Sequence, residues 1–393
     1  MNKTKALGNS AIVLYFIIGL EIMIMISPFA GFFYSVFNPF LLETAKYPST
    51  RWLSAFFLPH MVVPPDGFLK FIRIMGSVLF VSGMAGFLIC AFQVYANKFM
   101  KRGTALKGLY SIIRHPQYVM LSISGIGLSI LWPRFLVVAL WLVMILLYYF
   151  LSKDEERRML KQYPDTFRAY MEKTGMFLPK KIEQRLAPSG ATGKAMVFIA
   201  LTVITLGSAF FLRDYTVKHL PVWTDANVSA LAIIPEDMEK MEHRMPDIIS
   251  LEEVSSHFKE DEHYLVYFLP ANYIMQGLIA DTGSDWKLYK QHHTVSMITD
   301  WIFHPFRHLT EGHHAYHEMS GHSGHSMQDG IVRRLLFLRI ENVSIDKPSD
   351  LLSINARRVP TMMLDVEIHN MSVIDFKELP HDTGWGTVPT PVF

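Results

Sequence analysis

Residues 108–118 read Gly-Leu-Tyr-Ser-Ile-Ile-Arg-His-Pro-Gln-Tyr and stand immediately before two apolar stretches, 118–132 and 134–152. At about 1.5 Å of rise per residue, a helix over either stretch would be close to the thickness of a bilayer core or slightly shorter. A chain that crosses a membrane and returns ends on the side where it started. We therefore predict a membrane hairpin that brings His115 and Glu155 to the same membrane surface.

The composition extends this prediction to the whole N-terminal half. Half of the 393 residues are hydrophobic and only 18% are charged, which indicates membrane-spanning segments joined to a more polar region. Apolar runs of sufficient length, counting both legs of the hairpin, predict about five transmembrane helices. These runs lie at 11–37, 68–95, 118–132, 134–152 and 195–212.

The remainder of the chain, from residue 214 onward, is long enough to form a domain with its own core. Hydrophobic alternation predicts strands at 264–269, 335–343 and 363–369, and a helix is expected within 236–258. The predicted fold is thus an α-helical integral membrane domain followed by a β-rich domain.

We expect three parts along the chain: a membrane domain, a linker with the last transmembrane helix, and an extracytoplasmic β-rich, His-rich domain. Their predicted ranges are 1–186, 187–213 and 214–393.

The distribution of positive charge predicts the orientation, because Lys and Arg near helix ends are retained in the cytoplasm. They are concentrated before the first predicted span, between 98 and 114, and between 153 and 194. We therefore expect a cytoplasmic N-terminus, a cytoplasmic 153–194 segment and an extracytoplasmic 214–393 domain, which would be periplasmic for a bacterial inner-membrane protein. The formal net charge of +2 gives no basic field of the kind that nucleic-acid binding requires, so no nucleic-acid partner is expected.

The order of several short motifs resembles a known group of enzymes. The pattern Gly-x-Tyr-(x)3-Arg-His-Pro-x-Tyr is followed by Gly-Ile-Gly on the first leg of the hairpin and by Glu-Glu after the second. Together they are similar to the isoprenylcysteine carboxyl methyltransferase and phospholipid N-methyltransferase superfamily, over roughly residues 70–180. The resemblance implies an integral-membrane enzyme that uses S-adenosylmethionine and methylates a membrane lipid or a small apolar acceptor.

The resemblance also implies roles for individual residues. Arg114 and Glu156 would be catalytic. The residues that would bind the cofactor are Tyr110, His115, Pro116, Tyr118, Gly125, Gly127, Glu155 and Glu156.

Each of these residues has a simpler interpretation. Adjacent glutamates after a span are most often solvated charges at the interface, and Arg114 and His115 could anchor the hairpin at the level of the lipid headgroups. A Gly-x-Gly pattern within a span is commonly a helix-packing contact. The ordered combination favours the cofactor site.

A cluster of histidines suggests a second chemistry. Met319 and Met327 are interspersed with seven histidines, His304, His308, His313, His314, His317, His322 and His325. Imidazole together with thioether suits copper, while imidazole alone also suits zinc or nickel. The same composition is found in polar, solvated segments that bind metals only weakly. The outer domain therefore leaves an alternative function open: a non-catalytic or accessory subunit of a membrane complex, with an extracytoplasmic domain that binds copper or partner subunits.

Overall fold

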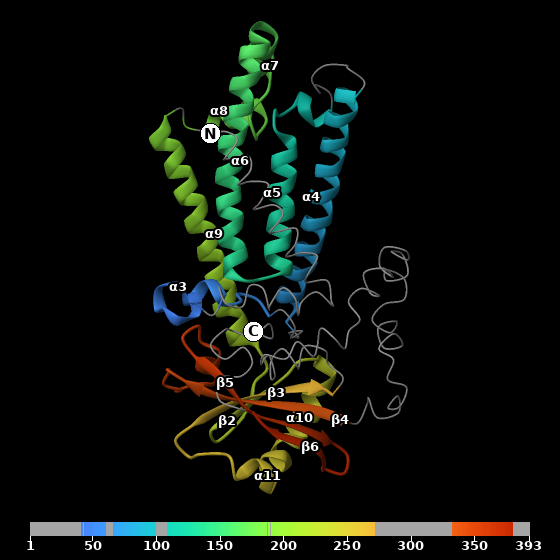
Figure 1. The fold of residues 1–393 in the computed structure, drawn as a ribbon, viewed down its shortest axis with the longest axis vertical. Coiled ribbons are helices and arrows are strands. Elements are labelled where there is room, and N and C mark those ends of the chain that lie inside the picture. The colour runs from blue at the N-terminus through green and yellow to red at the C-terminus, as the bar shows by residue number, and fades with distance from the viewer. Residues whose placement is uncertain are drawn as a thin grey trace. The chain divides into compact units, whose positions relative to one another are not determined.

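The structure of the 393-residue chain is a computed structural model (Figure 1). It describes residues 41, 43–59, 66–99, 108–186, 188, 190–271 and 332–379. These residues divide into two compact units, which we describe separately. The first contains the described residues from 66 to 215, and the second contains those before 66 and those from 216 onward.

The first unit is helical. Its elements are α4 (Gly67–Phe99), the 3-10 helix η1 (Gly108–Ser111), α5 (Pro116–Leu131), α6 (Phe135–Gln162), α7 (Pro164–Lys173), α8 (Lys180–Leu186) and most of α9 (Ala191–His219). Three of these helices, α4, α6 and α9, are long and apolar enough to cross a membrane, and α5 is a shorter apolar helix of 16 residues. The predicted span at 11–37 lies outside the described residues, so the count of five spans stays a prediction.

Prolines determine where the helices of the hairpin begin and end. Pro116 occupies the first turn of α5 and Pro164 the first turn of α7, positions at which the missing N–H costs no intrahelical hydrogen bond. Because Pro164 cannot continue α6, that helix ends at Gln162.

Glycines allow α4 and α5 to pack closely along their length. A Cβ atom added at Gly127 would lie 2.6 Å from the carbonyl oxygen of Gly76, and one added at Gly83 would lie 2.7 Å from the carbonyl oxygen of Met120. Side chains therefore do not fit at these two positions, because backbone would have to move. The hydroxyl of Ser124 adds a hydrogen bond of 3.3 Å to a carbonyl oxygen of α4.

The second unit is built on one six-stranded mixed sheet (Figure 1). Its strands lie side by side in chain order: β1 (Trp223–Asp225), β2 (Val228–Ala232), β3 (His263–Pro270), β4 (Val332–Glu341), β5 (Arg357–Glu367) and β6 (Ser372–Glu378). Among these six strands, only β2 and β3 pair in parallel. A parallel pair needs a crossover connection, which here contains the short η2 (Pro235–Asp237), α10 (Met238–Ile249) and α11 (Glu252–Ser255). In the sequence, α3 (Pro48–Ser54) precedes the first unit, and η4 (Pro348–Leu352) stands between β4 and β5.

The strands predicted at 264–269, 335–343 and 363–369 are confirmed as β3, β4 and β5, and the predicted helix as α10 and α11. The strands β1, β2 and β6 were not predicted. They are short or lie at an edge, and β2 has no polar alternation because all five of its residues are buried.

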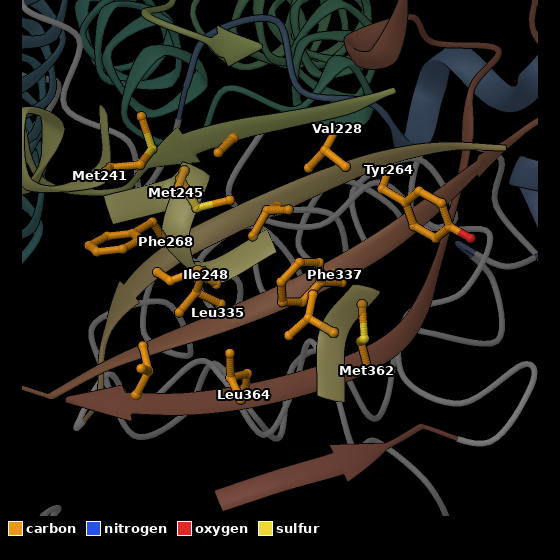
Figure 2. Packing of buried hydrophobic residues seen from close by; sticks show 14 of the residues in the cluster. Val228, Met241, Met245, Ile248, Tyr264, Phe268, Leu335, Phe337, Met362 and Leu364 are labelled. Atoms are coloured by element: carbon orange, nitrogen blue, oxygen red, sulfur yellow. The ribbon is translucent and has the colours of Figure 1, made fainter. Parts of the chain in front are cut away.

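Side chains cover both faces of this sheet. Figure 2 shows one apolar cluster, in which α10 contributes Met241, Met245 and Ile248 and the strands contribute residues such as Phe268 and Phe337. Alternate residues of β3, including Leu265 and Tyr267, are fully buried in a cluster on the opposite face. The near-continuous apolar sequence of β3 follows from burial on two sides.

Candidate active site

The Arg114–His115 dipeptide is held by backbone contacts with a segment about 60 residues later. The N–H of Arg114 donates to the carbonyl of Gly175 over 2.8 Å, and that of His115 donates to the carbonyl of Met176 over 3.1 Å. Ile113 and Gly175 form an isolated parallel bridge. The turn before α5 is thereby tied to the segment that follows α7.

Glu156 lies in the centre of this junction. Its side chain is 4% exposed, and the Arg114 guanidinium, 6% exposed, donates to it from Nε over 2.6 Å. Arg114 also donates to the carbonyl oxygen of Thr174, and the ammonium of Lys153 lies 3.7 Å from the second carboxylate oxygen. Glu156 and Arg114 therefore hold together α6, the start of α5 and the residues after α7.

Glu155 has a different environment, because neighbouring residues of an α-helix point about 100° apart. Its side chain is 36% exposed. One carboxylate oxygen accepts a hydrogen bond of 2.6 Å from the hydroxyl of Tyr118, and the other lies 3.3 Å from Nδ1 of His115. Glu155 is thus the glutamate of the pair that solvent and ligands can reach.

His115 lies between the two carboxylates. Its Nδ1 is 3.3 Å from Glu155 and its Nε2 is 3.5 Å from Glu156; these are ion-pair distances, and neither nitrogen makes a well-aligned hydrogen bond within the described residues. Burial by itself lowers the pKa of the imidazole, but the two carboxylates outweigh this effect, so the pKa of His115 is raised above its usual value. The site therefore favours the imidazolium form of His115.

Aromatic rings surround these charged groups. Tyr118 stacks on Tyr148 of α6 with ring centroids 4.7 Å apart, and His115 lies 6.0 Å from the ring of Phe177. Tyr110 donates from its hydroxyl to the side chain of Gln117 over 3.0 Å, and burial raises the pKa of Tyr110. The Tyr110 phenol therefore stays a neutral hydrogen-bond donor.

The structure brings most of the predicted residues together. Arg114, His115, Tyr118, Glu155 and Glu156 meet at the start of α5 and the charged end of α6. Their roles in catalysis and cofactor binding stay predictions, since no ligand contact tests them.

Three other predicted residues lie beside this junction or away from it. Pro116 is buried and begins α5. Gly125 and Gly127 lie about 15 Å or more along the helix from His115; Gly127 packs on the backbone of α4, and Gly125 packs on the ring of Trp141. These contacts are those of helix packing, and a part for the two glycines in a cofactor pocket stays a prediction.

Sequence reasoning missed several residues that complete the junction. Thr174 and Gly175 contribute only backbone carbonyls to Arg114, so their residue types give no signal in the sequence. Tyr148 and Ser152 precede Glu156 by eight and four residues, which places all three on one face of α6. Ser152 is fully buried, and its hydroxyl has no hydrogen-bond partner within the described residues.

The predicted metal site cannot be placed. All seven histidines of the 304–325 cluster lie outside the described residues, and the part of the chain that the structure describes contains no group of three or more His, Cys, Asp or Glu side chains that could hold a metal ion. Nothing here supports copper binding, which stays a prediction.

Comparison with known proteins gives one family. Residues 92–166 match the model of the phospholipid methyltransferase family. This range contains α5 and the side chains of Arg114, His115, Glu155 and Glu156, and it confirms the resemblance inferred from the motifs. No curated protein and no solved structure matches the chain. Over this segment the chain is similar to phospholipid methyltransferases, and it carries apolar helices long enough to cross a membrane.

Proposed function

We propose that this protein is an integral-membrane methyltransferase that uses S-adenosylmethionine and modifies a lipidic or small apolar acceptor. The observation that carries the proposal is the convergence of Arg114, His115, Glu155 and Glu156 at one end of an apolar helical hairpin. This convergence falls within the segment that matches phospholipid methyltransferases.

The groups present at the site fit this cofactor. S-adenosylmethionine supplies a methyl group on a positively charged sulfur, and it also carries an ammonium group and ribose hydroxyls. The exposed carboxylate of Glu155 can accept hydrogen bonds from such donors and can balance positive charge. The Ser152 hydroxyl is a second polar group that lacks a partner within the described residues, and buried groups of this kind normally require one.

The remaining residues position these groups. The buried pair of Arg114 and Glu156 fixes the start of α5 against α6, and Tyr118 holds the carboxylate of Glu155 over 2.6 Å. Transfer of a methyl group depends mainly on alignment of the reactants and on exclusion of water. A network of buried, paired charges provides the rigidity that this alignment needs.

One side of α6 presents apolar side chains outward. Val143 and Phe150, seven residues apart on that side of the helix, are 48% and 46% exposed. Exposed apolar side chains on a helix long enough to cross a membrane are suited to contact with acyl chains. An acceptor dissolved in the bilayer would reach the protein from the same surroundings.

The proposal includes the cytoplasmic placement of the site in a bacterial inner membrane, which the positive charges between 153 and 194 support. Copper binding by the outer domain and association with membrane-complex subunits are not needed for it.

Binding of S-adenosylhomocysteine to the detergent-purified full chain tests the proposal by calorimetry. We expect binding by the wild type, a loss of at least tenfold in Glu155→Ala, and no change in the control Arg168→Ala, whose side chain is exposed on α7. Transfer of an isotope-labelled methyl group into extracted lipids should follow the same order. Absence of binding by the wild type would refute the proposal and favour the accessory-subunit alternative.

A further inference from the structure

The short helix α8 (Lys180–Leu186) has no buried residue. Ile182 and Leu186 are four residues apart on α8 and are 46% and 66% exposed, and Leu178, just before the helix, is 41% exposed. Aliphatic side chains at this spacing lie on one stripe of a helix. An exposed apolar stripe of this kind needs an apolar surrounding.

The position of α8 in the chain indicates which surrounding this is. Four residues separate this helix from α9, which is long and apolar enough to cross a membrane. The chain therefore passes from α8 directly into the bilayer. A helix with an apolar stripe at this place is suited to lie in the interface plane of the membrane.

The charges of α8 match an anionic surface. Lys180, Lys181 and Arg185 are its basic residues and Glu183 is its acidic one. Lys180 donates to the carbonyl of Met171 over 3.2 Å. In the described part of the chain, no hydrogen bond or ion pair occupies the exposed side chains of Lys181 and Arg185. Both are therefore available for phosphate groups of lipids.

Contacts connect α8 to the site. The Glu183 carboxylate accepts a hydrogen bond from the N–H of Met176. The carbonyl of Met176 in turn accepts a hydrogen bond from the N–H of His115 over 3.1 Å. A Cβ atom at Gly175 would lie 3.1 Å from the carbonyl carbon of Leu178, so the segment just before α8 also packs on the residue that binds the backbone of Arg114.

We propose that α8 binds anionic phospholipids of its own leaflet through Lys181 and Arg185, with its aliphatic stripe among the acyl chains. This binding stabilises the 174–176 segment and, through it, the position of Arg114 and His115. The lipid-binding surface stands independently, whereas the regulation of the site by anionic lipid rests on the proposed function.

The first experiment measures the surface without reference to the site. The full chain in neutral detergent is titrated with phosphatidylglycerol or phosphatidylcholine, and bound lipid is counted by native mass spectrometry. Each basic residue near an anionic surface strengthens binding by about fivefold, so the double variant Lys181→Gln, Arg185→Gln should bind phosphatidylglycerol about 25-fold more weakly and phosphatidylcholine equally well. The matched control Arg168→Gln, Lys173→Gln removes the same charge from α7 and should bind like the wild type. Equal phosphatidylglycerol binding by variant and control would overturn the assignment.

The second experiment measures regulation in nanodiscs of phosphatidylcholine alone or mixed with phosphatidylglycerol. Phosphatidylglycerol should tighten S-adenosylhomocysteine binding several-fold in the wild type and leave it unchanged in the Lys181→Gln, Arg185→Gln variant. Binding that is independent of lipid charge would overturn the regulation while the proposed function stands. If the wild type binds no S-adenosylhomocysteine in either disc, the proposed function and the regulation fail together. The lipid titration then still shows whether α8 binds anionic lipid.

Discussion

Adjacent glutamates at the end of α6 should respond in opposite ways to substitution. Replacing Glu156 with alanine should destabilise the protein strongly, whereas replacing Glu155 should weaken ligand binding with little loss of stability. The two substitutions remove the same side chain from consecutive positions, so each serves as the control for the other.

The expected magnitudes follow from burial and from the partners that each substitution leaves behind. Glu156→Ala leaves the guanidinium of Arg114, 6% exposed, without its carboxylate, and removal of one partner of a buried ion pair costs about 3–5 kcal/mol. Glu155 is 36% exposed, and its partner Tyr118 is only partly buried. Water can replace that hydrogen bond, so Glu155→Ala should cost about 1 kcal/mol.

Cys90 provides the assay. It is the single cysteine of the chain and is 1% exposed, so a thiol-reactive fluorescent maleimide reports when its surroundings open. A difference of about 2–4 kcal/mol corresponds to roughly 30- to 1000-fold faster labelling in Glu156→Ala than in Glu155→Ala, where opening is in rapid equilibrium. Equal labelling of the two variants would refute the assignment of Glu156 as the buried member of the pair.

Two further predictions concern the junction and the helix packing. The pKa of His115 is raised in the folded state, so His115 should contribute stability that is fully present below about pH 6.5 and is lost as the pH rises through the folded-state pKa. The thermal unfolding temperatures of wild type and His115→Gln should therefore differ more at acidic than at alkaline pH. A difference that does not change with pH would contradict this. Gly127→Ala should cost about 1–3 kcal/mol of stability, because its Cβ would meet backbone of α4. In the control Gly207→Ala, no atom lies within 4 Å of the added Cβ, so the unfolding temperature in detergent should be unchanged or slightly raised. Similar losses in both variants would exclude the backbone contact.

Much of the helical architecture could be predicted from local sequence. A run of apolar residues with proline at its start is sufficient to define α5, and Pro164 is sufficient to end α6, because both effects act within one or two helical turns. The order Arg-His-Pro-x-Tyr and then Glu-Glu was enough to indicate the family segment that the comparison identifies at 92–166. The strands β3, β4 and β5 were also predicted, since they supply most of the strand residues in the two apolar clusters.

Tertiary contacts decide how the two glutamates differ. In the sequence Glu155 and Glu156 are equivalent neighbours, and only the packing of α6 against α5 exposes one and surrounds the other with Arg114 and His115. The same holds for the 174–176 segment, which acts through backbone carbonyls that every residue possesses. Its contacts with the start of α5 span about 60 residues, and neither periodicity nor residue type encodes which distant carbonyl an N–H group will meet. The burial of one carboxylate and the accessibility of the other therefore arise only when the chain has folded.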